Sequence, residues 1–226
     1  MRLSDQDVNL FYKLHPKLLV YTNQQMKLIK GITTVEEIKA LPFEDLLRIT
    51  TTLWDNLSLI DAFVAKNPFD FLQEELDIVL SWKNMMKGEF FLVRYLKKYA
   101  VFLEEKSGRA YGVVAITNEF KDILGDRLPI LVKTVLLPLK GQITYHGFLQ
   151  PSAISFGSGI RKSMDRLYQR AKAEYGIITE LPFSPHAVTR NDVQLLKYYL
   201  KNKRNRVYYQ EEIWDLIEKD RELMIL

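Results

Sequence analysis

The hydrophobic pattern of this chain changes near Glu89, and this change limits what the chain can fold into. Before that point, apolar residues recur at the three- and four-residue spacing of helices, in segments that Gly88 brings to an end. After it, short runs rich in Val, Ile, Phe, Tyr and Leu alternate with turn residues, as strands do. The pattern predicts an all-helical unit followed by a β-rich one.

The helical unit has recognisable ends. Ser4 can cap a first helix, which Pro16 is expected to kink, and Thr34 with Glu37 forms a capping box for a short helix that ends before Pro42. The further helices are predicted at 43–54, 57–65 and 72–86.

Strands are predicted at 90–96, 99–104, 111–116, 130–137 and 142–149. Turns at 106–109 and 138–141 connect two pairs of them as hairpins, so we expect an antiparallel sheet of four or five strands or a small barrel.

Helical patterns return at about 160–175, 191–201 and 208–223, with a linker at 181–186. The expected fold class is α+β: a helical N-terminal unit, a central antiparallel sheet or small barrel, a helix packed on it, and a C-terminal helical pair. The corresponding units are 1–88, 89–182 and 183–226.

The composition narrows the function classes. The 226 residues are 47% hydrophobic, enough for a packed core, and the absence of cysteine excludes disulfides, thiolate metal sites and cysteine nucleophiles. His15, His146 and His186 lack metal-ligand spacing, so we expect no metal and no cofactor. A polar N-terminus and the lack of an apolar run of about 18 residues predict a cytoplasmic protein without a membrane partner.

Positive charge is concentrated in one part of the chain. Residues 156–206 hold 11 Lys and Arg against 4 Asp and Glu, whereas the last segment, 210–226, is acidic and the net charge of the whole is only +4. This distribution favours an anionic partner, although a solvated basic face beside an acidic tail would show the same pattern.

The turn at 156–163 is a candidate anion site. Two glycines precede a helix N-terminus, where free N–H groups, the Ser158 and Ser163 hydroxyls, Arg161 and Lys162 could bind a phosphate. The spacing matches neither a Walker loop nor a dinucleotide fingerprint, and an ordinary tight turn with a cap is the alternative.

The helix that follows carries two rows of side chains. Ile160, Met164, Leu167 and Ala171 form an apolar stripe that should dock on the sheet. Lys162, Arg166 and Arg170 lie on another face, where they would track a phosphate backbone or simply face water.

Tyrosines and basic residues alternate between 195 and 209. Aromatic rings can stack on unpaired bases while Lys203, Arg204 and Arg206 neutralise phosphates. In the alternative interpretation Leu196, Tyr199 and Leu200 lie in a core and residues 203–206 form a polar loop between helices. The aromatic residues then form a protein interface, and they are Tyr198, Tyr199, Tyr208, Tyr209 and Trp214.

Evidence for catalysis is weaker. His146, with Tyr145 and Arg161 as companions, is the best single candidate for a titrating catalyst, but a lone histidine in a strand is more often structural. No nucleophile elbow or kinase signature occurs, so the sequence assigns no catalytic residue and favours a non-catalytic protein.

Several strings of residues together resemble an uncharacterised family of prokaryotic cytoplasmic proteins. The resemblance extends over about 5–182, implies a prokaryotic origin and brings with it no activity, cofactor or catalytic residue. The strings are KKYAVFL from Lys97, YGV from Tyr111, VLLPLKG from Val135 with Tyr145 and Gly147, FGSGI from Phe156, and GIITELP from Gly176.

We therefore expect a non-catalytic nucleic-acid-binding protein, for RNA or single-stranded DNA rather than a specific duplex site. The alternative is a protein-interaction or assembly subunit, with a protein partner or a second copy of the chain bound through the tyrosines and Trp214. An enzyme acting on a phosphorylated small molecule comes third.

Overall fold

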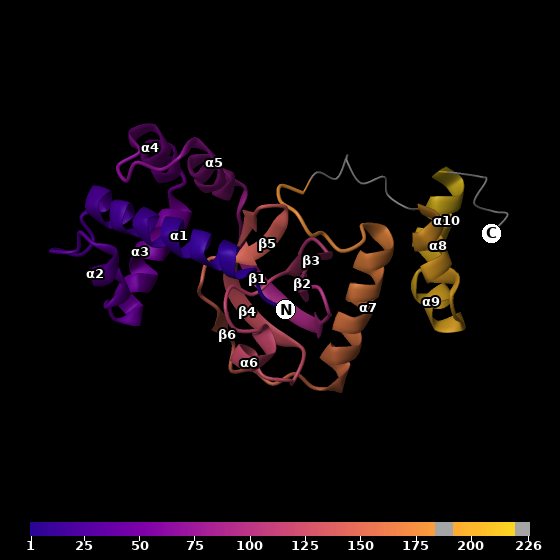
Figure 1. Cartoon of the computed structure of the whole chain (residues 1–226). Coiled ribbons are helices and arrows are strands. Elements are labelled where there is room, and N and C mark those ends of the chain that lie inside the picture. Colours follow the sequence, from indigo (N-terminus) through magenta and orange to yellow (C-terminus); the bar gives the residue numbers. More distant parts are fainter. Residues whose placement is uncertain (184–191, 220–226) are drawn as a thin grey trace.

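A computed structural model gives the structure of the chain and describes residues 1–183 and 192–219. Helices at both ends flank a small β-barrel, so the predicted α+β class is confirmed (Figure 1). His186, Asn191 and the predicted helical residues beyond 219 lie outside the described residues.

The N-terminal helices follow the sequence pattern except at the end of the unit, where the helix predicted at 72–86 stops at Ser81 and Gly88 lies inside the first strand. Ser4 caps the first helix and the capping box of Thr34 and Glu37 is present, whereas Pro16 lies inside one continuous helix. The bounds are α1 Asp5–Met26, α2 Val35–Lys39, α3 Phe43–Asp55, α4 Ser58–Lys66, α5 Gln73–Ser81 and a 3₁₀ turn η1 at Trp82–Asn84.

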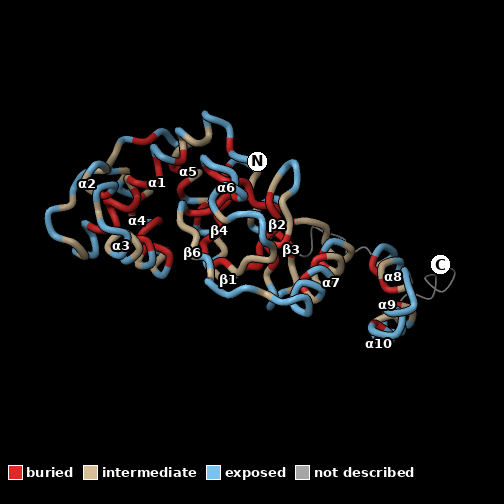
Figure 2. Tube along the Cα trace, turned by 90° about the horizontal axis from the view of Figure 1, so that it is seen from below, coloured by how far each residue is buried: buried red, intermediate tan, exposed pale blue. Residues whose placement is uncertain are grey.

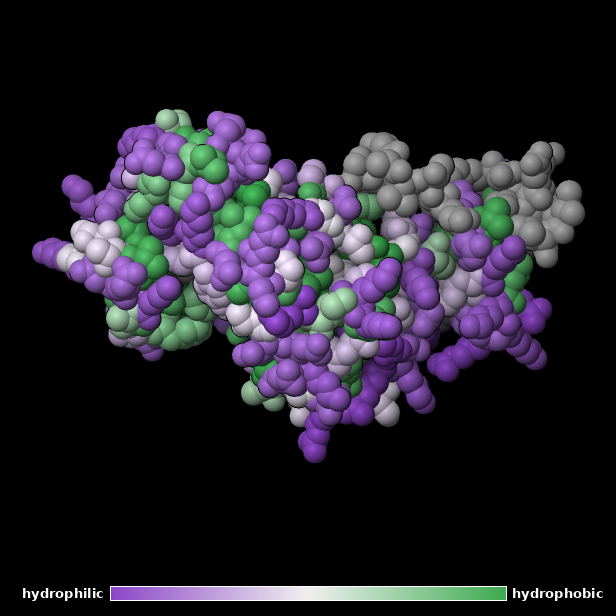
Figure 3. All heavy atoms as spheres, in the orientation of Figure 1, coloured by the Kyte–Doolittle hydropathy of each residue, from purple (hydrophilic) through white to green (hydrophobic). Residues whose placement is uncertain are grey.

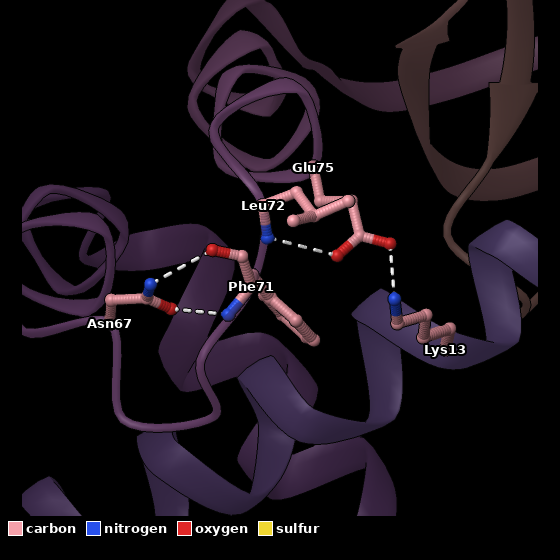
Figure 4. A network of polar contacts seen from close by, with 5 residues as sticks. All are labelled: Lys13, Asn67, Phe71, Leu72 and Glu75. Atoms are coloured by element: carbon pink, nitrogen blue, oxygen red, sulfur yellow. Dashed lines mark hydrogen bonds and ion pairs between the residues drawn. The ribbon is translucent and has the colours of Figure 1, made fainter.

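Polar contacts hold the start of α5 in place (Figure 4). The Asn67 side chain donates to the Phe71 carbonyl at 2.9 Å and accepts from the Phe71 N–H at 2.8 Å. Glu75 accepts from the Leu72 N–H at 3.2 Å and forms an ion pair with Lys13 of α1. The loop before α5 is thereby tied to the first helix.

Within the described residues, six strands form the sheet. Their bounds are β1 Met86–Tyr95, β2 Ala100–Glu104, β3 Arg109–Val113, β4 Ile130–Leu139, β5 Gln142–Tyr145 and β6 Gln150–Pro151, and the short α6 Phe120–Leu124 lies between β3 and β4.

Strand β1 closes the barrel because it is long enough to pair twice. Its first part pairs with β4 and its last part with β2, giving the closed order β1-β2-β3-β5-β4, with β6 beside β4. β3 and β5 run parallel through Val113 and Ile143, so the sheet is mixed and the purely antiparallel arrangement expected from sequence is wrong at this pair.

A closed five-stranded barrel is comparable to the OB-fold, which is also a five-stranded barrel. In that fold the face of strands 2 and 3 is the usual ligand surface. Fold alone does not establish function.

Helix α7, Ser158–Glu174, covers the outside of this face, which confirms the predicted helix on the sheet. Met164, Tyr168 and Ala171 pack against apolar residues of β1, β2 and β3. Ile160, which the sequence pattern placed in the apolar stripe of this helix, is 43% exposed. Tyr168 is buried, although the predicted stripe did not include it.

The C-terminal helices form a small core of their own beside α7 (Figure 1). They are α8 Asp192–Leu200, α9 Lys203–Tyr208 and α10 Gln210–Lys219. The segment expected to be a basic loop between two helices is the helix α9, which Asn202 caps by accepting from the Asn205 N–H at 2.9 Å.

One apolar core runs from the helical unit into the barrel (Figure 2). At their junction, His15 stacks between Phe11 and Trp54, and the Trp54 indole N–H donates to His146 Nδ1 at 3.2 Å. Burial lowers the pKa of each histidine to about 3, with the neighbouring His15 and Lys87 adding to the effect on His146. Both imidazoles are therefore neutral at pH 7.

We predict that His15→Phe reduces the loss of stability in mild acid. An unfolded histidine takes up a proton near pH 6.5, while folded His15 stays neutral to about pH 3, so the unfolded state gains protons and the unfolding free energy falls as pH decreases through this window. In urea titrations, the fall in unfolding free energy between pH 6.5 and 4.5 should be about 2 kcal/mol smaller for His15→Phe than for the parent protein.

His146→Phe is the matched comparison. It leaves the buried Trp54 N–H without its acceptor and should cost about 1–3 kcal/mol at pH 7, whereas His15→Phe, which removes a ring nitrogen that already lacks a partner, should not. Equal losses for both variants at pH 7 would contradict this account.

Gly112 of β3 is predicted to tolerate no side chain. A Cβ at this position would lie 2.8 Å from the ring of Tyr99, whereas a Cβ at Gly88 of β1 would meet only ordinary contacts at 3.7 Å. Gly112→Ala should lower the unfolding free energy by about 1–3 kcal/mol, and Gly88→Ala should leave it unchanged or raise it by up to about 1 kcal/mol. Chemical denaturation of both variants tests this, and a stable Gly112→Ala protein would disprove it.

Candidate nucleic-acid interface

In the first turn of α7, no acidic side chain and no side-chain cap offsets the partial positive charge of the helix N-terminus. Gly157, the N-cap residue, offers no side-chain acceptor, and no acidic residue lies in the first turn. The first N–H groups of a helix lack partners within it and carry partial positive charge. Arg161 and Lys162 add full charges close by, although both are disfavoured near a helix N-terminus.

Arg161 lies between two surface depressions of about 310 and 300 Å³, both of which also border Pro129. Its Nε donates to the Phe156 carbonyl at 3.2 Å, which holds the side chain across the start of the helix. Lys162 borders the first depression, and Arg127, from the loop before β4, borders the second. The two depressions meet at Arg161 and Pro129 beside the first turn, and we call them together the basic groove.

Few carboxylates neutralise this groove. Arg94 forms an ion pair with Asp165, but within residues 1–183 and 192–219 no carboxylate lies within ion-pair distance of Arg127, Arg161 or Lys162. An anion could therefore approach these three cations without displacing an internal partner.

Arg166 and Arg170 are less exposed than Lys162, the third member of the basic row predicted from sequence. The Arg166 guanidinium is 5.1 Å from the centre of the Tyr208 ring and donates to the Ser163 hydroxyl at 3.3 Å. Arg170 lies 6.0 Å from the Tyr209 ring and pairs with Glu174 at 3.6 Å. Both are half-buried and face the C-terminal helices, so the row does not continue as a solvated track.

The tyrosines join these helices to one another and to α7. Tyr199 and Tyr209 are buried and stack at 4.4 Å between ring centres, and burial raises the pKa of Tyr199 to about 12. The Tyr198 hydroxyl donates to the Arg166 carbonyl at 3.2 Å. Among the aromatic residues singled out from sequence, Tyr208 and Trp214 are the exposed ones, at 62% and 57%.

Helix α9 presents a second basic surface. Lys203, Arg204 and Arg206 are exposed, and no carboxylate of the described chain lies within ion-pair distance of them. Tyr208 follows on the same helix beside the exposed Val207.

The two basic surfaces are neighbours. Tyr208 touches Arg166, which lies five residues after Arg161, or about 7.5 Å along the helix axis. Figure 3 shows strongly hydrophilic side chains over the lower part of α7 and over α9. We call this surface the basic face, made up of Arg127, Ser158, Arg161, Lys162, Arg166, Lys203, Arg204, Arg206 and Tyr208.

Sequence analysis missed two parts of the site. Arg127 gave no signal beyond its place in a turn, because only the barrel brings that turn to the start of α7. The docking of this helix on the sheet was predicted, but not which strands it covers, and its place over β2 and β3 keeps a ligand from reaching those strands from outside.

The proposed catalytic companions do not converge. His146 lies between α3 and the barrel in a cleft with Trp54, whereas Arg161 lies at the start of α7, and Tyr145, although next to His146 in sequence, does not line that cleft. Within the described residues, no three side chains of the metal-binding types gather to hold an ion, and no helix has the length and apolar character to cross a membrane.

No family model, curated protein or solved structure matches this chain. The resemblance to a prokaryotic family stays a prediction.

We predict that Ser158→Asp stabilises the protein. A carboxylate in the first turn of α7 would interact with the unpaired N–H groups and with Arg161, raising the unfolding free energy by about 0.3–1 kcal/mol at low salt. Ser158→Asn has the same shape without the charge and should have a smaller effect. Urea titrations at low and high salt distinguish the two variants. Identical unfolding free energies would show that a negative charge in the first turn does not stabilise the protein.

Proposed function

We propose that the protein is a non-catalytic binder of single-stranded nucleic acid, RNA or DNA, and that it uses the basic face. The observation that carries this proposal is the set of cations without carboxylate partners at the start of α7 and on α9, together with the exposed Tyr208, which contacts Arg166 of α7.

The chemistry of the basic face suits a flexible polyanion. Lysine and arginine side chains on phosphates release counterions, which supplies affinity without reading sequence. Tyr208 offers an open ring on which an unpaired base can stack, and Arg166 behind the ring strengthens its hold by a cation–π contact. Stacking of this kind requires bases that are not paired, which favours a single strand over a duplex.

The barrel supports the proposal only by analogy. OB-fold barrels bind oligonucleotides on the face of strands 2 and 3, which α7 covers here. In our proposal α7 and α9 supply the contact surface in place of the covered strands.

A second candidate function is protein interaction or assembly. The exposure of Trp214, Tyr208 and Val207 favours it, since large exposed aromatic residues are enriched at interfaces. Tyr199 and Tyr209 would contribute indirectly, by holding the helices that present these residues.

Binding is tested by fluorescence anisotropy with labelled single strands of RNA and DNA between about 50 and 200 mM salt. Arg161→Glu with Lys162→Glu should weaken binding at least about tenfold and lower the salt slope by about 1.4, because about 0.7 is lost for each phosphate contact of a single strand. The double variant Lys203→Glu with Arg204→Glu should show the same loss of affinity and the same decrease in salt slope.

The matched control is Lys30→Glu with Lys39→Glu, which makes the same change in net charge on the distant helical unit and should change affinity little. If this pair weakens binding as much as the α7 pair does, attraction is due to net charge and the basic face is not the site. No binding by the intact protein at low salt would refute the proposed function.

Tyr208 has its own test. Tyr208→Ala should weaken binding by about 5- to 150-fold, which corresponds to about 1–3 kcal/mol for one stacked base, whereas Tyr208→Phe keeps the ring and should bind like the parent protein. If the phenylalanine variant fails as the alanine variant does, the hydroxyl and not the stacking surface is the relevant group.

A further inference from the structure

A second concave site lies between helix α3 and the barrel, and its lining shares no residue with the basic face. This cleft has a volume of about 140 Å³. Its lining combines residues of α3 with residues of β1, β4, β6 and the segment after β5, and they are Leu47, Thr50, Thr51, Trp54, Lys87, Lys133, Thr134, Val135, His146, Phe148 and Gln150.

Aromatic residues form one wall, and His146 and Trp54 among them are buried. The rings of His146 and Trp54 meet edge to face at 6.1 Å, and Phe148 lies 5.4 Å from His146. Phe43, half exposed, packs edge-on against Phe148 at 6.0 Å. Such a wall favours a flat apolar or aromatic group.

His146 offers a fixed hydrogen-bond donor. Its Nδ1 accepts from the Trp54 indole N–H, so a neutral ring must carry its hydrogen on Nε2. The pKa of His146, lowered by burial to about 3, keeps the ring neutral at pH 7. Nε2 has no partner among the described residues and is not sealed from solvent, so its N–H is available to a ligand in the cleft.

The charged groups at the cleft are cations. Lys87 pairs with Asp55, and Lys133 is exposed without an ion pair to any described residue. Glu89 lies opposite Lys133 in the β1–β4 pairing, but it does not line the cleft. Since no carboxylate lines the cleft, its electrostatic preference is for an anion.

We propose that this cleft binds a small aromatic carboxylate, whose ring lies against Trp54 and Phe148 and whose carboxylate accepts from His146 Nε2–H and from Lys133. The volume suits such a ligand, since an apolar cavity of about 150 Å³ holds one benzene molecule. The site is independent of the basic face and of nucleic acid. Because the cleft joins α3 to the barrel, occupancy also holds the helical unit on the barrel.

Titration with benzoate, followed by two-dimensional ¹H–¹⁵N NMR of the tryptophan indole groups, tests this site. The Trp54 signal, assigned with Trp54→Phe, should shift progressively, because its N–H donates to the ring that would bind the carboxylate. The signals of buried Trp82 and exposed Trp214 should stay in place. Benzamide, with the same shape and no charge, should bind at least about fivefold more weakly.

Two variants make the test specific. Lys133→Met keeps most of the side-chain stem of an exposed residue and should weaken benzoate binding about five- to tenfold while leaving the benzamide shift unchanged. Arg161→Glu with Lys162→Glu, at the basic face, should leave benzoate binding as it is. The proposal is overturned if the Trp54 signal does not move, if benzoate and benzamide bind equally, or if Lys133→Met binds benzoate like the parent protein.

Discussion

The packing of α7 on the outer face of the barrel is the contact on which the rest of the site depends. Met164, Tyr168 and Ala171 are buried there against β1–β3, and full burial of one large apolar side chain is worth about 1.5–3 kcal/mol. This contact fixes the first turn of α7 beside Arg127, and it gives α8–α10 a surface to attach to. The same contact closes the face that OB-fold barrels commonly use for ligands.

Local sequence patterns were sufficient for most of the elements but not for their pairing. The strand β1, the turn before β5 and the capping box at Thr34 follow from neighbouring residues, and the structure has all three. The parallel pairing of Val113 with Ile143 joins residues 30 positions apart and depends on how the barrel closes, which no local pattern records. Helix α9 was missed because its many basic residues resemble a loop, whereas Asn202 supplies the cap that starts it.

The candidate site was predictable only where it depends on residues that are neighbours in the sequence. Arg161 and Lys162 are exposed at the helix start, where the sequence placed them, since that position depends only on the turn before α7. The side chain of Arg166 faces Tyr208. These residues belong to separate helices, and local sequence patterns do not show that folding brings the two helices into contact. The cleft at His146 was beyond sequence reasoning, because Trp54, its hydrogen-bond partner, lies 92 positions away.

The basic face places positive charge where a helix N-terminus is already positive, an arrangement that costs stability unless an anion is bound. The most direct test is a ¹H–¹⁵N NMR titration of the backbone amides with a single strand of about ten nucleotides, within the usual site sizes of single-strand binders. Our account predicts shifts at residues 158–162 and 203–208, with β2 and β3 unchanged beneath α7. Shifts confined to β2 and β3, or to the cleft at α3, would contradict it.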